Sequence, residues 1–333
     1  MREDIIVITG GDPAGIGPEM LRSMSADFRA AGRRILYLFT AGKNERSAFE
    51  RAIREHGLSL ADVPLKRIAE HSFEHDITLA AVDEALEDME PGRPSEHGGQ
   101  RAFQALRAAC EFIGARGCRG LLTAPISKEW IARAGQGDFR GHTDYLADSF
   151  QSSVLMLMHG KRFSVIPLTI HIPLADVPEA LKDAVSSPEL PTLLMMLRNM
   201  EAFKDTQWAM CGLNPHAGEG GILGAEEGDF IQAFIALRSA EGLPLEGPVP
   251  ADAVFQDESL RRYRLILGCY HDQVLIPFKA LEGRHGVNCT VGLPFPRTSP
   301  DHGTAFDIAG RGLSDPTSMR EAFQLLVEGG LRT

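Results

Sequence analysis

The stretch DIIVITGGDPAGIGPE, from Asp4 to Glu19, joins a short run of β-branched residues to a glycine-rich loop and to a proline that suits the first turn of a helix. The same order of strand, loop and helix recurs along the chain, with apolar strand-like runs at 35–39, 120–123 and 265–270. Strands that alternate with helices predict an α/β fold with parallel or mixed sheets. The loop lacks the lysine of a phosphate-binding P-loop, because Ile16 stands at that position, and we interpret it as a tight turn.

The length and composition of the chain set its general class. With 333 residues and 44% hydrophobic content, the chain is longer than a single core usually supports, and two lobes are expected. A net charge of -11 without any Lys/Arg-rich run excludes a nucleic-acid-binding or anionic-membrane surface, so an anionic ligand must be bound by a few local cations. The five cysteines form no C-x-x-C pair, and no apolar run is long enough to span a bilayer. We therefore expect a cytoplasmic protein with reduced thiols.

Three histidines occupy equivalent places in this pattern, each directly after an apolar run. His171 lies in LTIHIP, His216 in CGLNPHAG and His271 in LGCYHDQ. Ligands of open α/β sheets bind at the carboxyl ends of strands, so the three imidazoles could meet at one point. Three neutral imidazoles suit a catalytic divalent metal such as Zn, Co or Ni. The alternative is that each histidine caps a strand or forms a hydrogen bond in the core.

Two cations and one amide emerge from apolar segments further along the chain. Lys279 follows VLIPF, Arg297 follows GLPFP, and Asn288 lies in the strand-like GVNCTVG. A cation in this setting either extends into solvent or binds an anion, and a phosphorylated substrate would need such a local clamp. Upstream, the glycine-spaced loop AGQGDFRGHTDYLA presents His142 and Thr143 just before a predicted helix. A threonine in that position is commonly a helix cap.

Two sets of motifs resemble known dehydrogenases. HGTAFDIAGRGLSDP, from His302 to Pro316, is similar to the loop by which isocitrate and isopropylmalate dehydrogenases hold NAD, with Phe306 in place of their proline. A longer series follows the order of the 4-hydroxythreonine-4-phosphate dehydrogenase family: GDPAGIGPE, TAPISKE, GHTDYLA, TIHIPL, GLNPHAGEGG, GPVPAD, YHDQ, GVNCTVGLPF and RTSPDHGTAFDIAGRG. These motifs extend from Gly11 to Gly312, whereas residues 40–98 match poorly.

The resemblance implies two α/β/α lobes with mixed sheets, an isocitrate/isopropylmalate dehydrogenase-like fold and an active site in the cleft between the lobes. Residues 1–140 with 286–333 would form the lobe that holds the cofactor. Residues 141–285 would form the lobe that carries the metal ligands and the dimer interface. In the family the site is shared by the two subunits of a homodimer, and the same arrangement is expected here.

The reaction implied by the resemblance is oxidation of 4-phosphooxy-L-threonine to 2-amino-3-oxo-4-phosphooxybutanoate, with NAD or NADP and a divalent metal. The β-keto acid then decarboxylates to 3-amino-2-oxopropyl phosphate, a precursor of pyridoxal phosphate. Related chemistry stays open on these motifs: D-threonate or D-erythronate 4-phosphate, or a dihydrodiol dicarboxylate, could be the substrate. From other classes, a phosphate acyltransferase or a non-catalytic binding protein are the alternatives.

Individual roles also follow from the resemblance. The metal ligands would be His171, His216 and His271, with Zn as first choice and Mg or Co as alternatives. Contacts to the substrate and its phosphate are expected from His142, Thr143, Lys279, Asn288 and Arg297. The cofactor loop is expected to contribute His302, Gly303, Thr304, Ala305 and Asp307. Candidates for accepting the proton of the alcohol are His142, Asp252 and Asp272, and a metal-bound hydroxide is a further one.

Overall fold

Strand β1 (Ile5–Thr9) lies inside a parallel sheet, and all five of its residues are buried. Its β-branched side chains suit a strand that is covered on both faces. The computed structural model describes residues 3–332, and within the first of two units the strand order is β3-β4-β2-β1-β5-β12. In this all-parallel sheet β1 pairs with β2 (Arg34–Phe39) and β5 (Gly120–Thr123). The other strands are β4 (Ile77–Ala81), β3 (Leu60–Asp62) and β12 (Arg297–Pro300).

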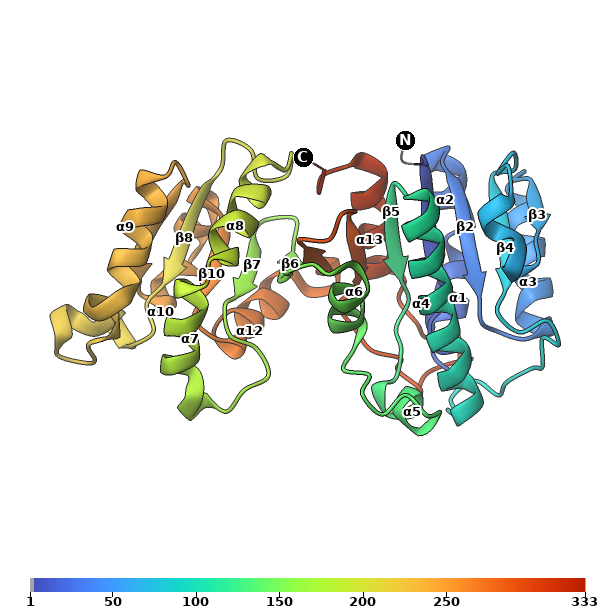
Figure 1. The fold of residues 1–333 in the computed structure, drawn as a ribbon, viewed down its shortest axis with the longest axis horizontal. Helices are drawn as coiled ribbons and strands as arrows, with labels where there is room; N and C mark the ends of the chain where they lie inside the picture. The colour runs from blue at the N-terminus through green and yellow to red at the C-terminus, as the bar shows by residue number, and fades with distance from the viewer. Residues whose placement is uncertain (1–2, 333) are drawn as a thin grey trace. The chain divides into compact units, whose positions relative to one another are not determined.

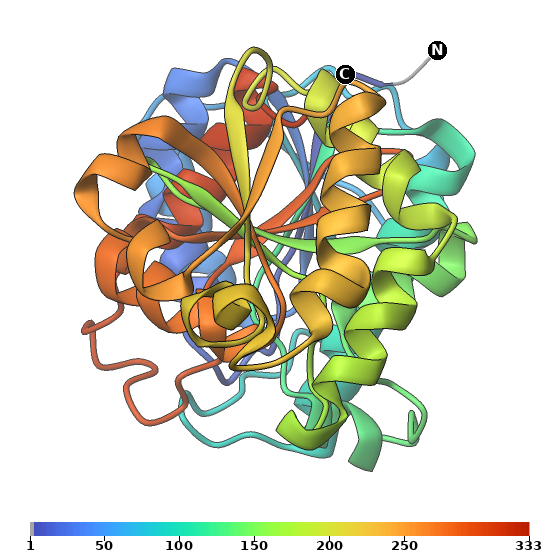
Figure 2. The ribbon, with the colours of Figure 1, turned by 90° about the vertical axis from the view of Figure 1, so that its left-hand side faces the viewer.

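Helices cover both faces of this first sheet (Figures 1 and 2). The longest, α4 (Glu96–Arg116), begins where the Ser95 hydroxyl accepts a hydrogen bond from the Gly98 amide, and it packs on β1 and β2. On the same side lie α5 (Lys128–Arg133) and α6 (His142–Phe150), together with the short helix η1 (Leu65–Glu70). The other face is covered by α1 (Gly17–Ser23), α2 (Ser25–Ala31), α3 (Lys43–Glu55) and α13 (Thr317–Glu328).

The second unit contains a mixed sheet in the order β11-β6-β7-β10-β8-β9. Strand β6 (Leu155–His159) runs antiparallel to both of its neighbours, β11 (Val287–Val291) and β7 (Ser164–Pro167). The remaining strands are parallel to β7: β10 (Tyr263–Gly268), β8 (Gln207–Cys211) and β9 (Leu245–Val249). The carboxyl ends of β7, β10 and β8 therefore lie at the same edge of the sheet.

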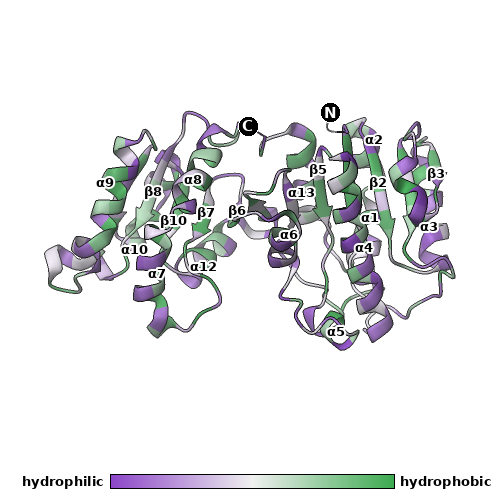
Figure 3. Cartoon of the chain, viewed as in Figure 1, coloured by the Kyte–Doolittle hydropathy of each residue, from purple (hydrophilic) through white to green (hydrophobic). Residues whose placement is uncertain are grey.

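Helices again cover both faces of the second sheet (Figure 2). On one side lie α7 (Val177–Ser186), α8 (Glu189–Asn199) and α9 (Gln232–Ala240), with the short segments η2 (Leu174–Asp176) and η4 (Glu227–Ile231). On the other lie α10 (Ala251–Val254), α11 (Asp257–Arg262) and α12 (His271–Glu282), followed by η5 (Gly283–His285). The strands of both units are mostly hydrophobic and the helices carry hydrophilic residues, as Figure 3 shows, so each unit has its own core between sheet and helices.

The boundaries of the two units lie later along the chain than the sequence suggested. The first unit runs to Ser152 and resumes at Leu293–Gly329, whereas the second comprises Ser153–Gly292 and the chain from Gly330. The sequence placed the breaks after residues 140 and 285. Helix α6 belongs to the first unit because it packs on α4, where the rings of Phe103 and Tyr145 meet edge to face at 5.3 Å.

Residues 57–98 contain two strands, β3 and β4, within the region that matches the family motifs poorly. Strand β4 pairs in parallel with β2 and β3, and Ile77 and Leu79 are fully buried. The five residues ITLAA hold too few large apolar side chains to be recognised as a strand from sequence. Among residues 3–332, every helix is too short or too polar to cross a membrane.

Candidate functional site

Three neighbouring strands of the second unit lead to the three strand-end histidines. His171 follows β7, His271 is the first residue of α12 after β10, and His216 lies in η3 (Pro215–Gly221) after β8. Because β10 pairs in parallel with both β7 and β8, all three histidines follow the same edge of one sheet. This is the place where open α/β sheets bind ligands.

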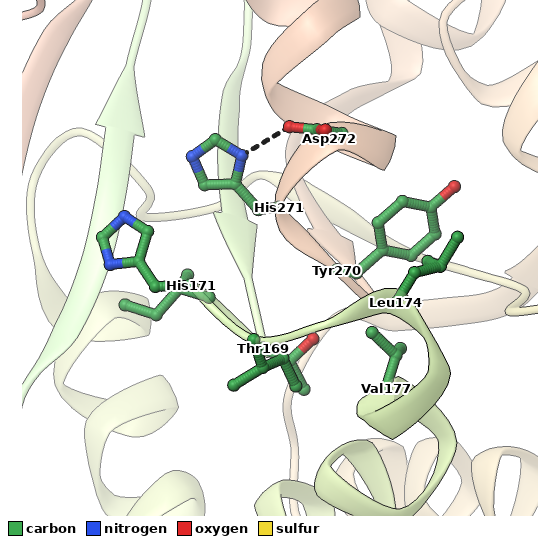
Figure 4. Close-up of a pocket in the computed structure, with 9 residues that line it drawn as sticks. Thr169, His171, Leu174, Val177, Tyr270, His271 and Asp272 are labelled. Atoms are coloured by element: carbon green, nitrogen blue, oxygen red, sulfur yellow. Dashed lines mark hydrogen bonds and ion pairs between the residues drawn. The ribbon is translucent and has the colours of Figure 1, made fainter.

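His171 and His271 lie side by side at this edge, with their ring centroids 5.8 Å apart (Figure 4). Both line a cavity of about 330 Å³, and the other lining residues are Thr169, Ile170, Ile172, Leu174, Val177, Tyr270 and Asp272. The Nδ1 atom of His271 lies 2.7 Å from Asp272 Oδ1. An ionised carboxylate there keeps the ring proton on Nδ1 and leaves Nε2 as the electron-pair donor, which is the usual arrangement of a metal-binding histidine.

The backbone around His171 is held by the ends of β7 and β10. The Leu168 amide donates to the Gly268 carbonyl at 2.9 Å, and the buried Thr169 hydroxyl donates to the Cys269 carbonyl at 2.8 Å. Beyond these contacts, His171 adopts a φ of 53°, in the left-handed region that non-glycine residues rarely enter. Such strain costs on the order of 1 kcal/mol and is concentrated at functional sites.

His216 has the same strained conformation but lies in a separate loop. Its φ is 54°, and each of the following residues up to Gly220 also has a positive φ. The buried carboxylate of Glu227 holds this loop by accepting from the Asn214 amide at 2.7 Å and from the Asn214 side chain at 2.9 Å. A Cβ atom at Gly218 would lie 2.6 Å from Glu227 Oε2, so glycine is required for this close approach. The loop is thus tightly braced, although His216 itself is exposed.

The structure therefore brings together two of the three predicted metal ligands. In the described part of the chain, no three His, Cys, Asp or Glu side chains are grouped so that they could hold a metal ion. The paired imidazoles and the carboxylate beside His271 fit the chemistry of a metal site, and no further residue among those that the structure describes completes a group of three at that place. Glu227 is a supporting residue, and no pattern in the sequence pointed to it.

A second set of predicted residues lies in the first unit. His142 opens α6, and its Nε2 atom is buried without a hydrogen-bond partner among residues 3–332. Burial and the positive charges of Arg297 and Lys128 hold the pKa of His142 well below its ordinary value of 6.5, so the imidazole is neutral. Arg297 begins β12, is buried, and donates from Nη2 to the Thr123 hydroxyl at 2.6 Å. Thr143 is half-buried in the first turn of α6.

The other predicted substrate residues belong to the second unit. Lys279 is exposed on α12, and Asn288 is half-buried on β11, where its Oδ1 atom has no partner among the described residues. Of the predicted proton acceptors, Asp252 is exposed on α10, while Asp272 is engaged by His271.

The predicted cofactor loop follows β12 and rests on the glycine-rich loop of the first unit. The Ile16 amide donates to the Thr304 carbonyl at 3.0 Å, and a Cβ atom at Gly15 would lie 2.9 Å from the same oxygen. In the loop, His302 Nδ1 lies 3.1 Å from the Gly303 carbonyl, and Ala305 has a φ of 45°. The tight turn at Gly10–Gly17 thus supports the predicted cofactor loop.

A cavity of about 550 Å³ lies beside these two loops. Glu19 lines it and accepts a hydrogen bond from the Gly310 amide at 3.0 Å. Its lining includes Gly310, Arg311 and Gly312 from the end of the cofactor loop, whereas His302–Asp307 are not part of it. The glycine spacing GDPAGIG and AGRG was the available sequence signal for this cavity.

Comparison with known proteins agrees with this fold over nearly the whole chain. A family model described as pyridoxal phosphate biosynthetic protein PdxA matches residues 40–326. The 4-hydroxythreonine-4-phosphate dehydrogenase of Ruegeria sp. (strain TM1040) is 42% identical over 322 residues, which are 96% of this chain and 95% of the relative. That of Roseobacter denitrificans is 36% identical over the same shares of both chains.

Solved structures confirm the predicted α/β fold. A crystal structure of 4-hydroxythreonine-4-phosphate dehydrogenase from Klebsiella pneumoniae has a TM-score of 0.79 and 31% identity, and the match covers 99% of this chain and 98% of that one. A beta-decarboxylating dehydrogenase from Thermococcus kodakarensis, at 12% identity and a TM-score of 0.52, shares the fold, with 98% and 84% of the two chains covered. The chain belongs to the PdxA family, whose matched members are 4-hydroxythreonine-4-phosphate dehydrogenases.

Proposed function

We propose that the chain oxidises 4-phosphooxy-L-threonine with NAD and the help of a divalent metal ion, and that the β-keto acid formed loses CO2 to give 3-amino-2-oxopropyl phosphate. Membership of the PdxA family makes the chain an NAD-type oxidoreductase of pyridoxal phosphate biosynthesis. The observation that carries the proposal is the pair His171 and His271 at the strand edge, with Asp272 on His271 Nδ1.

The donor set suits zinc, for which histidine nitrogens are common ligands. His171 and His271 would hold the ion, with His216 as the third ligand. When bound, the metal would supply Lewis acidity at the substrate's hydroxyl group, and NAD would supply the acceptor for its hydride. Asp272 orients His271 by holding the proton on Nδ1. This position favours an orienting role for Asp272 over the proton-accepting role that the sequence also allowed.

We infer that His216 completes the site from a second copy of the chain, in a homodimer. The surfaces beside the two histidine loops support this inference. Exposed apolar residues flank both strained histidines: Ile172 and Leu174 follow His171 with 39% and 69% exposure, and Ile222 follows the His216 loop with 79%. Apolar side chains exposed in such numbers mark interaction surfaces. The His216 loop is also already braced by the hydrogen bonds between Asn214 and Glu227, so it could present its imidazole to a partner subunit without first becoming ordered.

The substrate's phosphate group is assigned to Arg297, His142 and Thr143 of the first unit and to Lys279 and Asn288 of the second. Arg297 is buried and fixed by Thr123, so its guanidinium is a preorganised donor for phosphate oxygens. His142 has a neutral imidazole with an unpartnered buried nitrogen.

Of the three predicted proton acceptors, Asp252 is exposed, Asp272 is bound to His271, and the lowered pKa of His142 makes its imidazole a weak base that suits a hydrogen bond better than removal of a proton. The cofactor NAD is assigned to His302, Gly303, Thr304, Ala305 and Asp307, with the neighbouring cavity of about 550 Å³ available for part of the dinucleotide.

The test is NADH formation with the purified chain and a panel of substrates: 4-phosphooxy-L-threonine, D-threonate 4-phosphate, D-erythronate 4-phosphate and a dihydrodiol dicarboxylate. We expect the fastest turnover with 4-phosphooxy-L-threonine, loss of activity after chelation, and recovery when Zn, Co or Mg is added back. A higher kcat/KM with D-threonate 4-phosphate would reassign the substrate. Absence of NADH with every phosphorylated acid, in metal-replete protein, would refute the proposal.

A further inference from the structure

Lys128 lies closer to the predicted phosphate residues than its place in the sequence suggests. It is the first residue of α5, in the segment TAPISKE that follows β5. Its side chain passes the start of α6: a Cβ atom at Gly141 would lie 3.0 Å from Lys128 Cε and 3.3 Å from Nζ. Gly141 is the N-cap residue of α6 and has a backbone φ of 141°, which residues other than glycine rarely adopt. Glycine at this position thus leaves room for the lysine ammonium group beside His142.

The ammonium group of Lys128 has no counter-ion among residues 3–332. It forms no hydrogen bond or ion pair with any of them, and Asp144, in the first turn of α6, forms no ion pair with it. Arg297 and Lys128 both act on His142, whose pKa they lower. The amino end of α6, a helix of nine residues, adds a partial positive charge at the same place. Positive groups that act on one place favour an anion beside them.

We propose that Lys128 binds the phosphate group of the substrate, together with His142 and Arg297. This rests on the proposed function, which supplies a phosphorylated substrate. A phosphate with nearly two negative charges is held best by more than one cation, and the two cations here differ in kind. Arg297 is a fixed planar donor, whereas Lys128 is a compact charge on a flexible stem that can follow a substrate as it enters. In a chain with a net charge of -11, this local cluster would attract the anion.

The experiment compares Lys128→Gln with Lys66→Gln, which removes the same charge from an exposed lysine of the same unit. The KM for 4-phosphooxy-L-threonine and the inhibition constant of inorganic phosphate should both rise about 10- to 100-fold in Lys128→Gln, since one charge-assisted hydrogen bond is lost. The kcat and the KM for NAD should change less than about threefold. Lys128→Arg should recover part of both losses, and Lys66→Gln should behave as the unchanged protein.

The outcomes separate this inference from the proposed function. A raised KM with an unchanged phosphate inhibition constant would place Lys128 at the substrate's carboxylate and overturn the phosphate assignment. If neither constant changes, Lys128 does not contact the substrate, and the assignment is also overturned. If the unchanged protein fails to oxidise 4-phosphooxy-L-threonine, the proposed function falls. Calorimetric titration with inorganic phosphate then still decides the role of Lys128, because weaker binding by Lys128→Gln than by Lys66→Gln supports it and equal binding refutes it.

Discussion

The two units of the chain place histidines in opposite electrostatic surroundings. In the second unit, the exposed His171 and the half-buried His271 lie side by side, and a carboxylate lies 2.7 Å from one ring nitrogen of His271. In the first unit, His142 has a buried Nε2 and lies near Arg297 and Lys128. One environment favours a cation between the rings, and the other favours an anion beside the ring.

We infer from this difference that neighbouring charges, more than the imidazole itself, decide whether a histidine suits a cation site or an anion site. Asp272 increases the electron-donating power of His271, which suits a metal ligand. Burial, together with the cations around His142, lowers its pKa and keeps its ring uncharged, which suits a hydrogen-bond partner beside Arg297 and Lys128. The following predictions test whether the two environments have these separate functions.

The largest expected effect is a contrast between His271→Ala and His142→Ala. His271→Ala should lose the bound metal and at least ~100-fold in kcat/KM, because replacing even a supporting residue of a metal site costs about 10- to 100-fold. His142→Ala should keep its metal and lose affinity for the phosphorylated substrate. Metal content per chain by mass spectrometry, with steady-state kinetics, measures both. If His142→Ala also loses its metal, the division between a cation site and an anion site is wrong.

A smaller effect is expected when only the orientation of His271 is disturbed. Asp272→Asn keeps the shape of the side chain but removes the charge that holds the Nδ1 proton, so metal affinity should fall about 10- to 100-fold while the KM for substrate at saturating metal changes little. Competition with a chromogenic chelator gives the affinity. The control is Asp183→Asn on the exposed side of α7. Equal affinities in the two variants would remove Asp272 from the metal site.

The features of this arrangement that depend on a local sequence pattern could be predicted from the sequence. Apolar runs ending in histidine predicted the three strand ends, and the structure does place β7, β10 and β8 side by side. Pairing order between strands depends on contacts far apart in sequence, so the sequence alone did not show that His171 and His271 would meet while His216 would not.

Other parts could not be predicted because their determinants are not local. Glu227 is an ordinary acidic residue in sequence, and only the folded loop shows that it accepts hydrogen bonds from Asn214. Lys128 belongs to a recognised motif, but its contact with the start of α6 depends on the left-handed backbone of Gly141. The positive φ of His171 and of His216 is likewise a property of the fold, because propensity disfavours it at both positions.

The smallest expected effect concerns the stability of the first unit and its dependence on pH. In the unfolded chain the pKa of His142 returns to about 6.5, whereas burial, Arg297 and Lys128 keep it well below that value in the folded chain. As pH falls through 6.5, the unfolded state therefore binds a proton before the folded state does, and stability present above pH 6.5 is lost. Relative to His142→Asn, which cannot titrate, the unchanged protein should lose up to about 0.8 kcal/mol of unfolding free energy between pH 8 and pH 6.

Urea denaturation of both proteins at the two pH values measures this difference, and both values lie above the pI of 5.5, where net charge still keeps the chain in solution. Thr143→Asn, on the same turn of α6, is the control, because it makes a similar local change without removing a titrating group. A pH dependence that is the same in His142→Asn and in the unchanged protein would mean that His142 is protonated as easily in the folded chain as in the unfolded one. Burial and the cations around it would then have too weak an effect to distinguish its surroundings from those of His271.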